Sequence, residues 1–408
     1  MTNTPPQPKR ILVFSLAYFP HASGAEIAIK EITDRISCEH IAFDLVTLRF
    51  DRTSPLVEKI GNVRVYRVAG LPFGGYLNKV LFPLLAAVGA YRLHKKNHYD
   101  ALWAMMSYMV LPVVLLRTLF QVRLPYVLTL QDGDPFEHVF NRPHILPFRP
   151  LLKFGFKNAT VVQVISNYLG GWAKKVGCRG QVEVIPNGVD VQKFQRENMG
   201  EKIPHPLDCR AGEGVILITT SRLVQKNALD DVIRALVLLP ENLQNKTHFK
   251  VLGSGAEEAN LKKLAHDLGV ESCVEFLGNI DNAKVPQYLQ AADIFIRPSL
   301  TEGMGNSFIE AMAAGLPVIA TQEGGIADFL FDAKKNPEHP TTGWAVDKNS
   351  PKQIAEAVWD IVQNPEGTKK VVENAQKLAQ EKYDWELVVT DMRERVFGRV
   401  FARAPKTS

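Results

Sequence analysis

The chain has 408 residues, more than a single hydrophobic core normally serves, so we expect two domains. Apolar residues make up 46% and charged residues 22%, proportions that are typical of a globular protein and exclude a disordered or fibrous one. Residues 1–200 carry 24 Lys and Arg against 14 Asp and Glu (net +10) and residues 201–408 carry 24 against 29 (net −5), so the first half favours anionic partners.

The first nine residues are polar and Pro-rich, and they predict a flexible tail rather than a signal peptide. The apolar runs 80–91 and 101–116 predict no transmembrane helix, because the first is too short and Ser107 and Pro112 interrupt the second. Four widely spaced cysteines predict neither structural zinc nor a disulfide framework, as expected in a reducing cytoplasm.

Strand and helix patterns alternate after the tail. Short apolar and β-branched runs predict strands at 11–16, 43–48, 63–68, 101–105, 126–130, 159–166 and 182–186. Helices are predicted between several of them, at 24–37, 77–96 and 167–176. Apolar strands separated by helices indicate a parallel sheet that is covered on both faces.

The polar segment 187–214 predicts a linker, and the alternation then restarts. Strands are predicted at 215–221, 248–255, 274–278, 293–299 and 317–321, and helices at 351–363 and 366–382. We therefore predict an α/β protein with a tail (1–9), two doubly wound domains (10–200 and 201–383), and a last helix in 384–408 that leaves the second domain. Ligands are expected at the carboxyl ends of the strands.

The stretch RPSLTEGMGNSFIEAMAAGLPVIAT (297–321) predicts an anion site. Gly305 allows a tight turn, and the first amides of a helix that begins near Asn306 are unpaired and face an incoming ligand. Glu302 lies before the turn, and Glu310 lies one helical turn after it. Both carboxylates would accept hydrogen bonds from hydroxyl groups that flank a phosphate, as on a sugar ring.

The same stretch has a structural alternative. Residues 307–310 read SFIE, an S-x-x-E capping box in which Ser307 and Glu310 serve the helix alone.

A second polar segment, TTSRLVQKN (219–227), follows a buried strand. Its Arg222 and Lys226 would project from the carboxyl end of that strand, where two cations hold a diphosphate and stabilise it as a leaving group. The alternative is a solvated loop with ordinary surface charge.

The first half contributes two further segments of this kind. In FPHASGAEIAIKEI (19–32), Gly24 opens a helix whose N-terminus suits a phosphate. In LTLQDGDPFEH (128–138), Gln131, Asp132 and Asp134 follow a strand and would reach a ligand crevice, or else form a loop that caps a helix.

Taken in order, these segments resemble the large retaining family of nucleotide-sugar glycosyltransferases with the GT-B fold, often called family 4. The resemblance covers about residues 10–400 and implies two Rossmann-like domains that face each other across a crevice, with the last helix crossing back onto the first domain. It is carried by SGAE (23–26), IPNGVD (185–190), SRLVQKN (221–227), VLGSG (251–255), AADIFIRPS (291–299), EGMGNSFIEAMAAGLPVIAT (302–321) and GG (324–325).

The resemblance implies a role for each candidate residue. Glu310 binds the nucleotide ribose, Glu302 contacts the donor sugar, and Arg222 and Lys226 hold the diphosphate, so that Glu302, Arg222 and Lys226 form the catalytic set. Backbone amides assist them, near Gly305, Asn306 and Ser307 and, from the first domain, at Gly24. The remaining candidates lie on the acceptor side, and they are His21, Gln131, Asp132, Asp134 and His138.

The sequence departs from the family at two catalytic positions. Arg222 and Lys226 stand four residues apart, where many members have one residue more. Many relatives carry a His in the loop after the fifth strand, close to the reacting sugar, where this chain has Gln131. His21 and His138 are therefore only neighbouring candidates.

The implied reaction transfers a glycosyl group with retained configuration. No carboxylate pair resembles that of retaining hydrolases, so family precedent favours front-face transfer, in which the departing phosphate takes the acceptor proton. No D-x-D stands where a metal-bound diphosphate needs it, because the sequence DGD (132–134) lies in the acceptor half. We expect no metal and no cofactor; the partners are a nucleotide sugar and a glycan or lipid-linked acceptor.

Two other functions are weighed against transfer. A nucleotide-sugar epimerase of the same fold would need acid and base groups, which Asp132, Asp134 and His138 would supply. A non-enzymatic nucleic-acid-binding protein is disfavoured, because the sequence shows neither a stacked-aromatic RNP pattern nor a basic helix.

A membrane contact is also predicted. The stretch NKVLFPLLAAVGAYRLHKK (78–96) places Arg92, Lys95 and Lys96 after an apolar run, as in segments that rest on anionic headgroups. We expect a cytoplasmic protein that is peripheral on the inner face of the cell membrane. The alternative is a buried helix with a solvated basic end.

Overall fold

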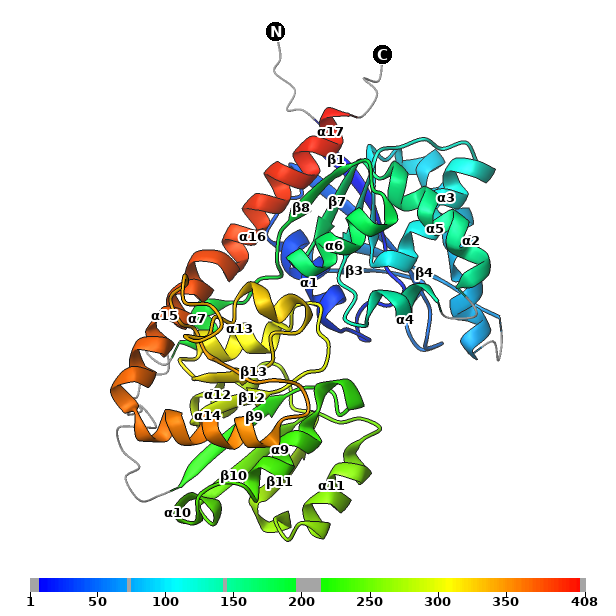
Figure 1. Ribbon diagram of the computed structural model, residues 1–408. Coiled ribbons are helices and arrows are strands. Elements are labelled where there is room, and N and C mark those ends of the chain that lie inside the picture. The colour runs from blue at the N-terminus through cyan, green and yellow to red at the C-terminus, as the bar shows by residue number, and fades with distance from the viewer. Residues whose placement is uncertain (1–6, 72–74, 142–144, 196–213, 404–408) are drawn as a thin grey trace. The chain divides into compact units, whose positions relative to one another are not determined.

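The computed structural model describes residues 7–71, 75–141, 145–195 and 214–403 (Figure 1). The chain divides into two units, each with its own sheet. Unit 1 comprises residues 1–187 and 385–408, and unit 2 comprises residues 188–384. The predicted domain boundary at 200–201 lies outside the described residues, and the division falls earlier, between Asn187 and Gly188.

Unit 1 is built on a sheet that has eight strands among the described residues, in the order β3-β4-β2-β1-β5-β6-β7-β8. Every pairing between described neighbours is parallel except that of β3 with β4. The strands are β1 (Lys9–Phe14), β2 (Ile41–Leu48), β3 (Val57–Ile60), β4 (Val63–Val68), β5 (Ala101–Met105), β6 (Tyr126–Leu130), β7 (Val161–Val164) and β8 (Gln181–Val184).

The helices of unit 1 include a segment from the C-terminal end of the chain. From the first part of the chain they are α1 (Gly24–Asp34), α2 (Gly75–Asn97), α3 (Val110–Leu119), α4 (Phe136–Phe140), α5 (Arg149–Asn158) and α6 (Asn167–Val176), with short 3₁₀ turns at Ser107–Met109 and Leu146–Phe148. From the last part they are α16 (Trp385–Asp391), a π-helical turn (Met392–Phe397) and α17 (Gly398–Ala402).

Unit 2 contains a sheet in the order β11-β10-β9-β12-β13-β14, and its described pairings are all parallel. The strands are β9 (Val215–Thr220), β10 (Thr247–Leu252), β11 (Val274–Gly278), β12 (Ile294–Arg297), β13 (Val318–Ala320) and β14 (Trp344–Ala345). The helices are α7 (Val191–Phe194), α9 (Leu229–Leu236), α10 (Glu241–Gln244), α11 (Glu258–Asp267), α12 (Val285–Gln290), α13 (Asn306–Ala313), α14 (Pro351–Gln363) and α15 (Pro365–Tyr383), with 3₁₀ turns at Gln225–Asn227, Glu271–Cys273 and Gly324–Asp328. The predicted two doubly wound α/β domains are confirmed.

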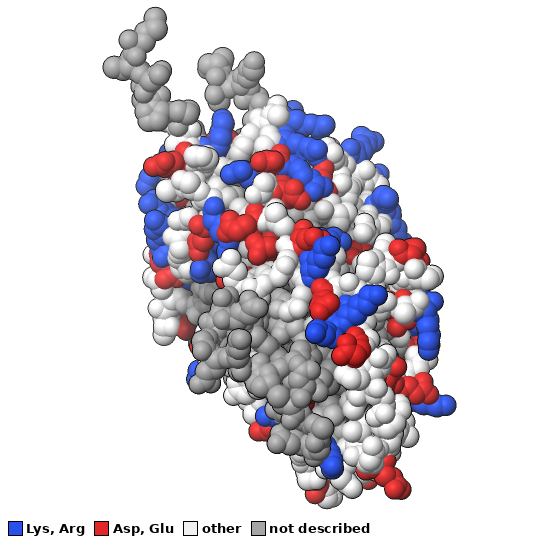
Figure 2. Space-filling view, turned by 90° about the vertical axis from the view of Figure 1, so that its left-hand side faces the viewer, with Lys and Arg blue, Asp and Glu red and all other residues white. Residues whose placement is uncertain are grey.

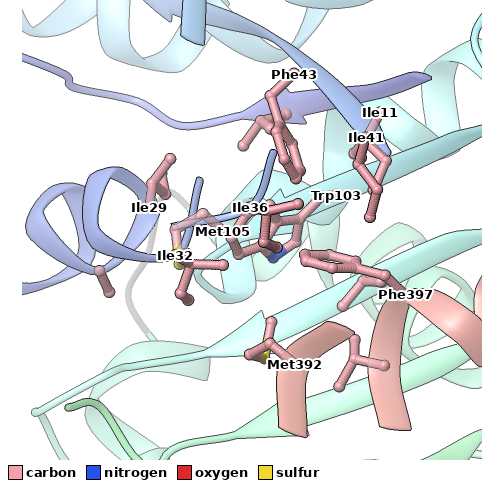
Figure 3. Packing of buried hydrophobic residues seen from close by; sticks show 14 of the residues in the cluster. Ile11, Ile29, Ile32, Ile36, Ile41, Phe43, Trp103, Met105, Met392 and Phe397 are labelled. Carbon is pink, nitrogen blue, oxygen red and sulfur yellow. The ribbon is translucent and has the colours of Figure 1, made fainter. Parts of the chain in front are cut away.

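The last helical segment lies in the core of unit 1. Figure 3 shows Phe397 of this segment next to Trp103 of β5, with Met392 below Phe397 and Phe43 of β2 above Trp103, all in one buried cluster. The ring of Phe397 lies 5.2 Å from that of Trp103 and 5.8 Å from that of Phe43. Two parts of the chain that are separated by all of unit 2 therefore form one core.

A buried carboxylate holds the same segment from the edge of the sheet. Glu183 on β8 accepts hydrogen bonds from Arg395 Nε (3.0 Å) and Nη2 (2.6 Å), and it also pairs with Arg399. Arg395 pairs in addition with Asp391, at 2.7 Å. On the face of the molecule seen in Figure 2, basic and acidic side chains are interspersed on the surface.

Candidate active site

The helix α13 begins in unit 2 with a turn that only glycine accommodates. Gly305 precedes the helix with a φ of +86°, and a Cβ there would lie 2.6 Å from the Phe308 ring and 2.7 Å from Arg297 Nη2. Gly305 has no side chain, so the N-cap residue itself does not cap the first amides of the helix. Ser307 lies inside the helix and not at its N-cap, so the capping-box interpretation of SFIE is wrong.

A buried arginine lies behind this helix N-terminus. Arg297 ends β12, where its Nη1 donates to the Thr220 carbonyl (3.2 Å) and to the Ser307 hydroxyl (2.9 Å). Its Nη2 donates to Glu302 Oε2 at 3.2 Å, and the guanidinium lies 4.1 Å from the centre of the Phe308 ring. The arginine therefore ties together the strand end, the turn and the first turn of the helix.

Glu302 is fixed at both of its carboxylate oxygens. Its Oε2 accepts from Arg297, and its Oε1 accepts from the Gly303 amide at 3.0 Å. The Glu302 carbonyl accepts from the Gly325 amide at 2.9 Å, and a Cβ on Gly324 would lie 2.0 Å from that carbonyl oxygen. The glycine pair 324–325 therefore lets the chain approach the Glu302 loop closely.

Glu310 is one turn into α13 and is partly buried. Burial raises the pKa of its carboxyl group to about 7, while the nearby cations Lys193 and Arg297 act to lower it. Lys193 belongs to α7, which packs against α13 and whose first turn is capped by Asp190. The carboxylate of Glu310 therefore lies in a site where its charge is costly until a polar partner is present.

The predicted diphosphate loop adjoins this turn. Arg222 and Lys226 follow β9, with Arg222 exposed and Lys226 partly exposed. The Leu300 amide donates to the Lys226 carbonyl at 2.7 Å, which joins this loop to the segment before Glu302. The structure therefore brings both predicted cations to the same edge of the unit 2 sheet as Glu302.

The sequence GSG has a structural role beside the diphosphate loop. A Cβ on Gly253 would lie 1.9 Å from the Ser221 carbonyl oxygen, and one on Gly255 would lie 2.2 Å from the Leu223 carbonyl oxygen. Both glycines are required because two backbone segments pass in contact there.

In unit 1, the N-terminus of α1 is occupied by the chain itself. The Glu26 carboxylate accepts from the Ser23 amide (2.8 Å) and from the Ser23 hydroxyl (2.6 Å). A Cβ on Gly24 would meet no atom within 4 Å. The predicted phosphate contact at Gly24 is therefore sterically open, but its helix already carries a carboxylate.

The acceptor-side candidates are divided between paired and exposed positions. Gln131 forms a reciprocal amide pair with Asn187, at 2.9 and 3.2 Å. Asp132 is buried, accepts from the Ser107 hydroxyl at 2.9 Å, and has its pKa raised by burial. Asp134 is partly exposed on the same loop.

The two histidine candidates are exposed and lie on different elements. His138 belongs to α4, and His21 lies before α1 with its ring 5.6 Å from that of Phe50. The structure therefore brings Gln131 and Asp132 together on one loop but does not group the histidines with them.

Two residues of the site were not predicted. The sequence predicted Arg297 only as part of a strand. An arginine directly after the apolar run DIFI could have indicated a buried cation at the end of that strand. Lys193 lay in the predicted linker, and nothing in the sequence placed it near Glu310.

Among the residues that the structure describes, no group of His, Cys, Asp or Glu side chains is arranged to hold a metal ion. None of the described helices has the length and hydropathy that are needed to cross a membrane.

Two family models match the chain in adjoining regions. The model described as Glycosyltransferase Family 4 matches residues 22–193, and the one described as Glycosyl transferases group 1 matches residues 210–378. Together the two regions contain every segment on which the family resemblance was based, from SGAE to the glycine pair.

Relatives of known sequence agree with these matches. A GDP-mannose-dependent alpha-(1-6)-phosphatidylinositol monomannoside mannosyltransferase of Mycobacterium tuberculosis is 31% identical over 50% of this chain and 52% of its own length. An uncharacterized glycosyltransferase of Methanocaldococcus jannaschii is 22% identical over 96% of this chain and 98% of its own. The chain spans about half the length of the first of these curated relatives.

Solved structures share the fold along the whole chain. Sucrose-phosphate synthase from Thermosynechococcus elongatus has a TM-score of 0.79 at 20% identity, over 97% of this chain and 99% of its own. The Anabaena protein HepE in complex with UDP-glucose has a TM-score of 0.74 at 19% identity, over 95% and 99%. With both family models matched and this fold throughout, the chain belongs to the group 1 and family 4 glycosyltransferases of the GT-B fold.

Proposed function

We propose that the protein transfers a sugar, with retention of configuration, from a nucleoside diphosphate sugar to a hydroxyl acceptor. The observation that carries the proposal is the N-terminus of α13, which begins at a glycine N-cap in the left-handed region and has Glu302 before it and Glu310 one turn into it. The N-terminus of a helix attracts an anionic group, and the two carboxylates accept hydrogen bonds from hydroxyl groups. A nucleoside diphosphate sugar presents these groups in the matching order, with sugar hydroxyls on one side of the diphosphate and ribose hydroxyls on the other.

Each residue then has a distinct task. The amides near Gly305 and Asn306, together with Arg222 and Lys226, hold the diphosphate. Glu310 accepts the ribose hydroxyls, and Glu302 accepts a hydroxyl of the donor sugar. In unit 1, the Gly24 turn is proposed to contact a phosphate of the donor, and the acceptor-side residues are proposed to bind the acceptor.

The chemical step breaks the bond between the anomeric carbon and the diphosphate oxygen and forms the bond to the acceptor oxygen. The acceptor proton passes to the departing phosphate on the same face of the sugar. The cations stabilise charge that grows on the leaving group, a contribution for which one preorganised donor is typically worth roughly 2.7–4 kcal/mol.

Thermal unfolding in the presence of GDP, UDP, GDP-mannose and UDP-glucose tests the proposal. A ligand at 100 times its dissociation constant adds about 2.7 kcal/mol of stability, so at least one of them is expected to raise Tm. Product analysis with the stabilising donor then separates transfer from epimerisation, because only transfer requires an acceptor. The absence of any stabilisation across a full nucleotide-sugar panel would contradict the proposal.

Independence from metal and cofactor belongs to the same proposal. Transfer is expected to persist after dialysis against EDTA, because Arg222 and Lys226 supply the positive charge on the diphosphate. A requirement for added Mg²⁺ or Mn²⁺ would contradict this part.

The acceptor is proposed to lie on the cytoplasmic face of an anionic membrane, with α2 as the contact. Tyr76, Leu77 and Leu84 on this helix are exposed at 59%, 50% and 45%, and Lys79 is exposed beside them. The opposite side of the helix is buried in unit 1 through residues such as Phe82. The mycobacterial relative, by its name, acts on a phosphatidylinositol mannoside, and a lipid-linked acceptor is proposed here by that likeness.

Vesicle binding tests the membrane contact. Vesicles that contain anionic lipid are expected to bind the protein more than neutral ones do, and binding should fall as salt rises. Leu77→Asp is expected to weaken binding, whereas Leu238→Asp, which changes a leucine of 52% exposure in unit 2, serves as the matched control. Equal partitioning to both kinds of vesicle would exclude the contact.

A further inference from the structure

The buried guanidinium of Arg297 contacts both a hydroxyl and a carboxylate of the proposed donor site. Its Nη1 lies 2.9 Å from Ser307 Oγ, and its Nη2 lies 3.2 Å from Glu302 Oε2. Only 5% of the residue is exposed, and the Phe308 ring and Gly305 lie against the guanidinium. The two contacts are therefore made in an enclosed site, where hydrogen bonds have a strong orienting effect.

The contact with Ser307 determines the direction of its hydrogen bonds. A guanidinium has five donors and no acceptor, so the Ser307 oxygen must accept from Arg297. The single proton of the hydroxyl is then left to donate elsewhere. Ser307 lies in the first turn of α13, at the end of a helix that favours anions. Its hydroxyl is thus prepared for a ligand that only accepts, such as a phosphate.

The contact with Glu302 leaves a hydrogen-bond acceptor for the ligand, where the contact with Ser307 leaves a donor. The carboxylate already accepts from Arg297 and from the Gly303 amide. Both of its oxygens are thus held as acceptors, and their remaining lone pairs suit a ligand hydroxyl.

We propose that Arg297 is a positioning residue that sets the hydrogen-bond polarity of the donor site, making Ser307 a donor to phosphate and Glu302 an acceptor of a sugar hydroxyl. The proposal rests on the proposed function of this site. One buried side chain thus makes one end of the site suited to the phosphates of the donor and the other end suited to its sugar.

Lysine is not an equivalent at this position. The ammonium group is a single point of charge, whereas the planar guanidinium directs separate nitrogens to Ser307 and Glu302. Burial lowers the pKa of Arg297 while Glu302 raises it, so the carboxylate helps keep the guanidinium charged.

Variants of Ser307 test the phosphate end first. The probes are GDP and UDP, with guanosine and uridine as phosphate-free controls. Ser307→Ala is expected to weaken binding of the diphosphate that the wild type prefers by about tenfold, the lower end for a hydrogen bond to a charged group. Ser307→Thr, which keeps the hydroxyl, should bind it like the wild type, and none of the variants should change nucleoside binding.

Variants of Arg297 then test the coupling. Arg297→Lys is expected to weaken diphosphate binding about as much as Ser307→Ala, and the double variant should be no weaker than Arg297→Lys alone. With a nucleotide sugar, Arg297→Lys should also lower kcat more than Ser307→Ala does, because it releases Glu302 as well as Ser307. Arg234→Lys, at an exposed arginine of the same unit, is the matched control and should behave like the wild type.

The outcomes separate this inference from the function on which it rests. If the wild type binds neither diphosphate, the proposed function is wrong. If the wild type binds one of them and Ser307→Ala binds it equally well, the inference is wrong while the function stands. Additive losses in a folded double variant would likewise overturn the inference, and Ser307→Ala decides it even where Arg297→Lys does not fold.

Discussion

The helices α1 of unit 1 and α13 of unit 2 carry the same S-x-x-E sequence near their N-termini, yet only one of them forms a capping box. In α1, Ser23 stands at the N-cap and Glu26 accepts from its amide and hydroxyl. In α13, the glycine turn begins the helix one residue before Ser307, which instead contacts Arg297. An identical pattern therefore forms a capping box in one helix and none in the other. The position of the N-cap decides between the two, and the spacing alone does not.

The largest loss of stability and of nucleotide-sugar binding is expected when Gly305, in the turn before α13, is replaced. Gly305→Ala places a Cβ at a φ of +86° and within 2.7 Å of both Phe308 and Arg297. Strain and crowding together are expected to cost about 2–5 kcal/mol and to abolish nucleotide-sugar binding. Calorimetry and nucleotide binding measure both effects. A stable variant with normal binding would show that the N-terminus of α13 is not the donor site.

The second effect concerns Glu310, which is no part of a cap. The pKa of Glu310 is raised to about 7, so between its ordinary pKa and about 7 the folded protein binds more protons than the unfolded chain. The stability that protonated Glu310 contributes at low pH is therefore lost as pH rises through about 7. Glu310→Gln does not ionise, so its Tm relative to the wild type is expected to increase between pH 6 and pH 8.

The nucleotide affinity of Glu310→Gln relative to the wild type should fall as pH rises, whereas its relative Tm increases. If ionised Glu310 accepts the ribose hydroxyls, Glu310→Gln weakens binding about tenfold or more above pH 7 and less below it. Comparing the two proteins at each pH removes the contribution of phosphate titration. An affinity ratio that is constant from pH 6 to pH 8 would contradict a ribose contact by the carboxylate.

A smaller effect is expected at the capping box of α1. Glu26→Gln and Ser23→Ala should each destabilise the protein by about 1 kcal/mol, as the loss of a helix cap does, without weakening nucleotide binding. Denaturant unfolding and titration with GDP or UDP check the two parts. Weakened nucleotide binding in both variants would place the N-terminus of α1 among the ligand contacts despite its cap.

The smallest effect on stability is expected from Gly24→Ala. The new Cβ meets no atom within 4 Å and the φ of Gly24 is not positive, so the change in unfolding free energy should stay within about 0.5 kcal/mol. A fall in kcat with unchanged Tm would indicate that a substrate approaches the backbone there. Wild-type kinetics would remove Gly24 from the site.

The fold could be predicted where strands were apolar and bounded by turn residues. The strands at 63–68, 101–105, 126–130 and 274–278 have the predicted bounds. Two edge strands were missed, β3 and β14. β3 reads VEKI, with charges that suit a solvated edge, and β14 has only two residues, so neither produces an apolar run.

The site was predicted less completely, because its contacts cross between elements. Glu302, Arg222 and Lys226 could be placed at strand ends from the sequence order, and the structure gathers them at one sheet edge. The contact of Arg297 with Ser307 depends on how α13 is oriented against β12, which no local pattern specifies. The buried position of Asp132 is likewise a tertiary effect.

The discontinuity of unit 1 has a consequence for synthesis. Because Phe397 fills the core beside Phe43 and Trp103, the first part of unit 1 lacks part of its core while the ribosome translates residues 188–384. At roughly 5–20 residues per second, that interval lasts about 10–40 s. Unit 2, whose sheet is continuous in the chain, can fold within it. The first unit to be started is thus the last to be completed, and nascent chains should show chaperone dependence until α17 has emerged.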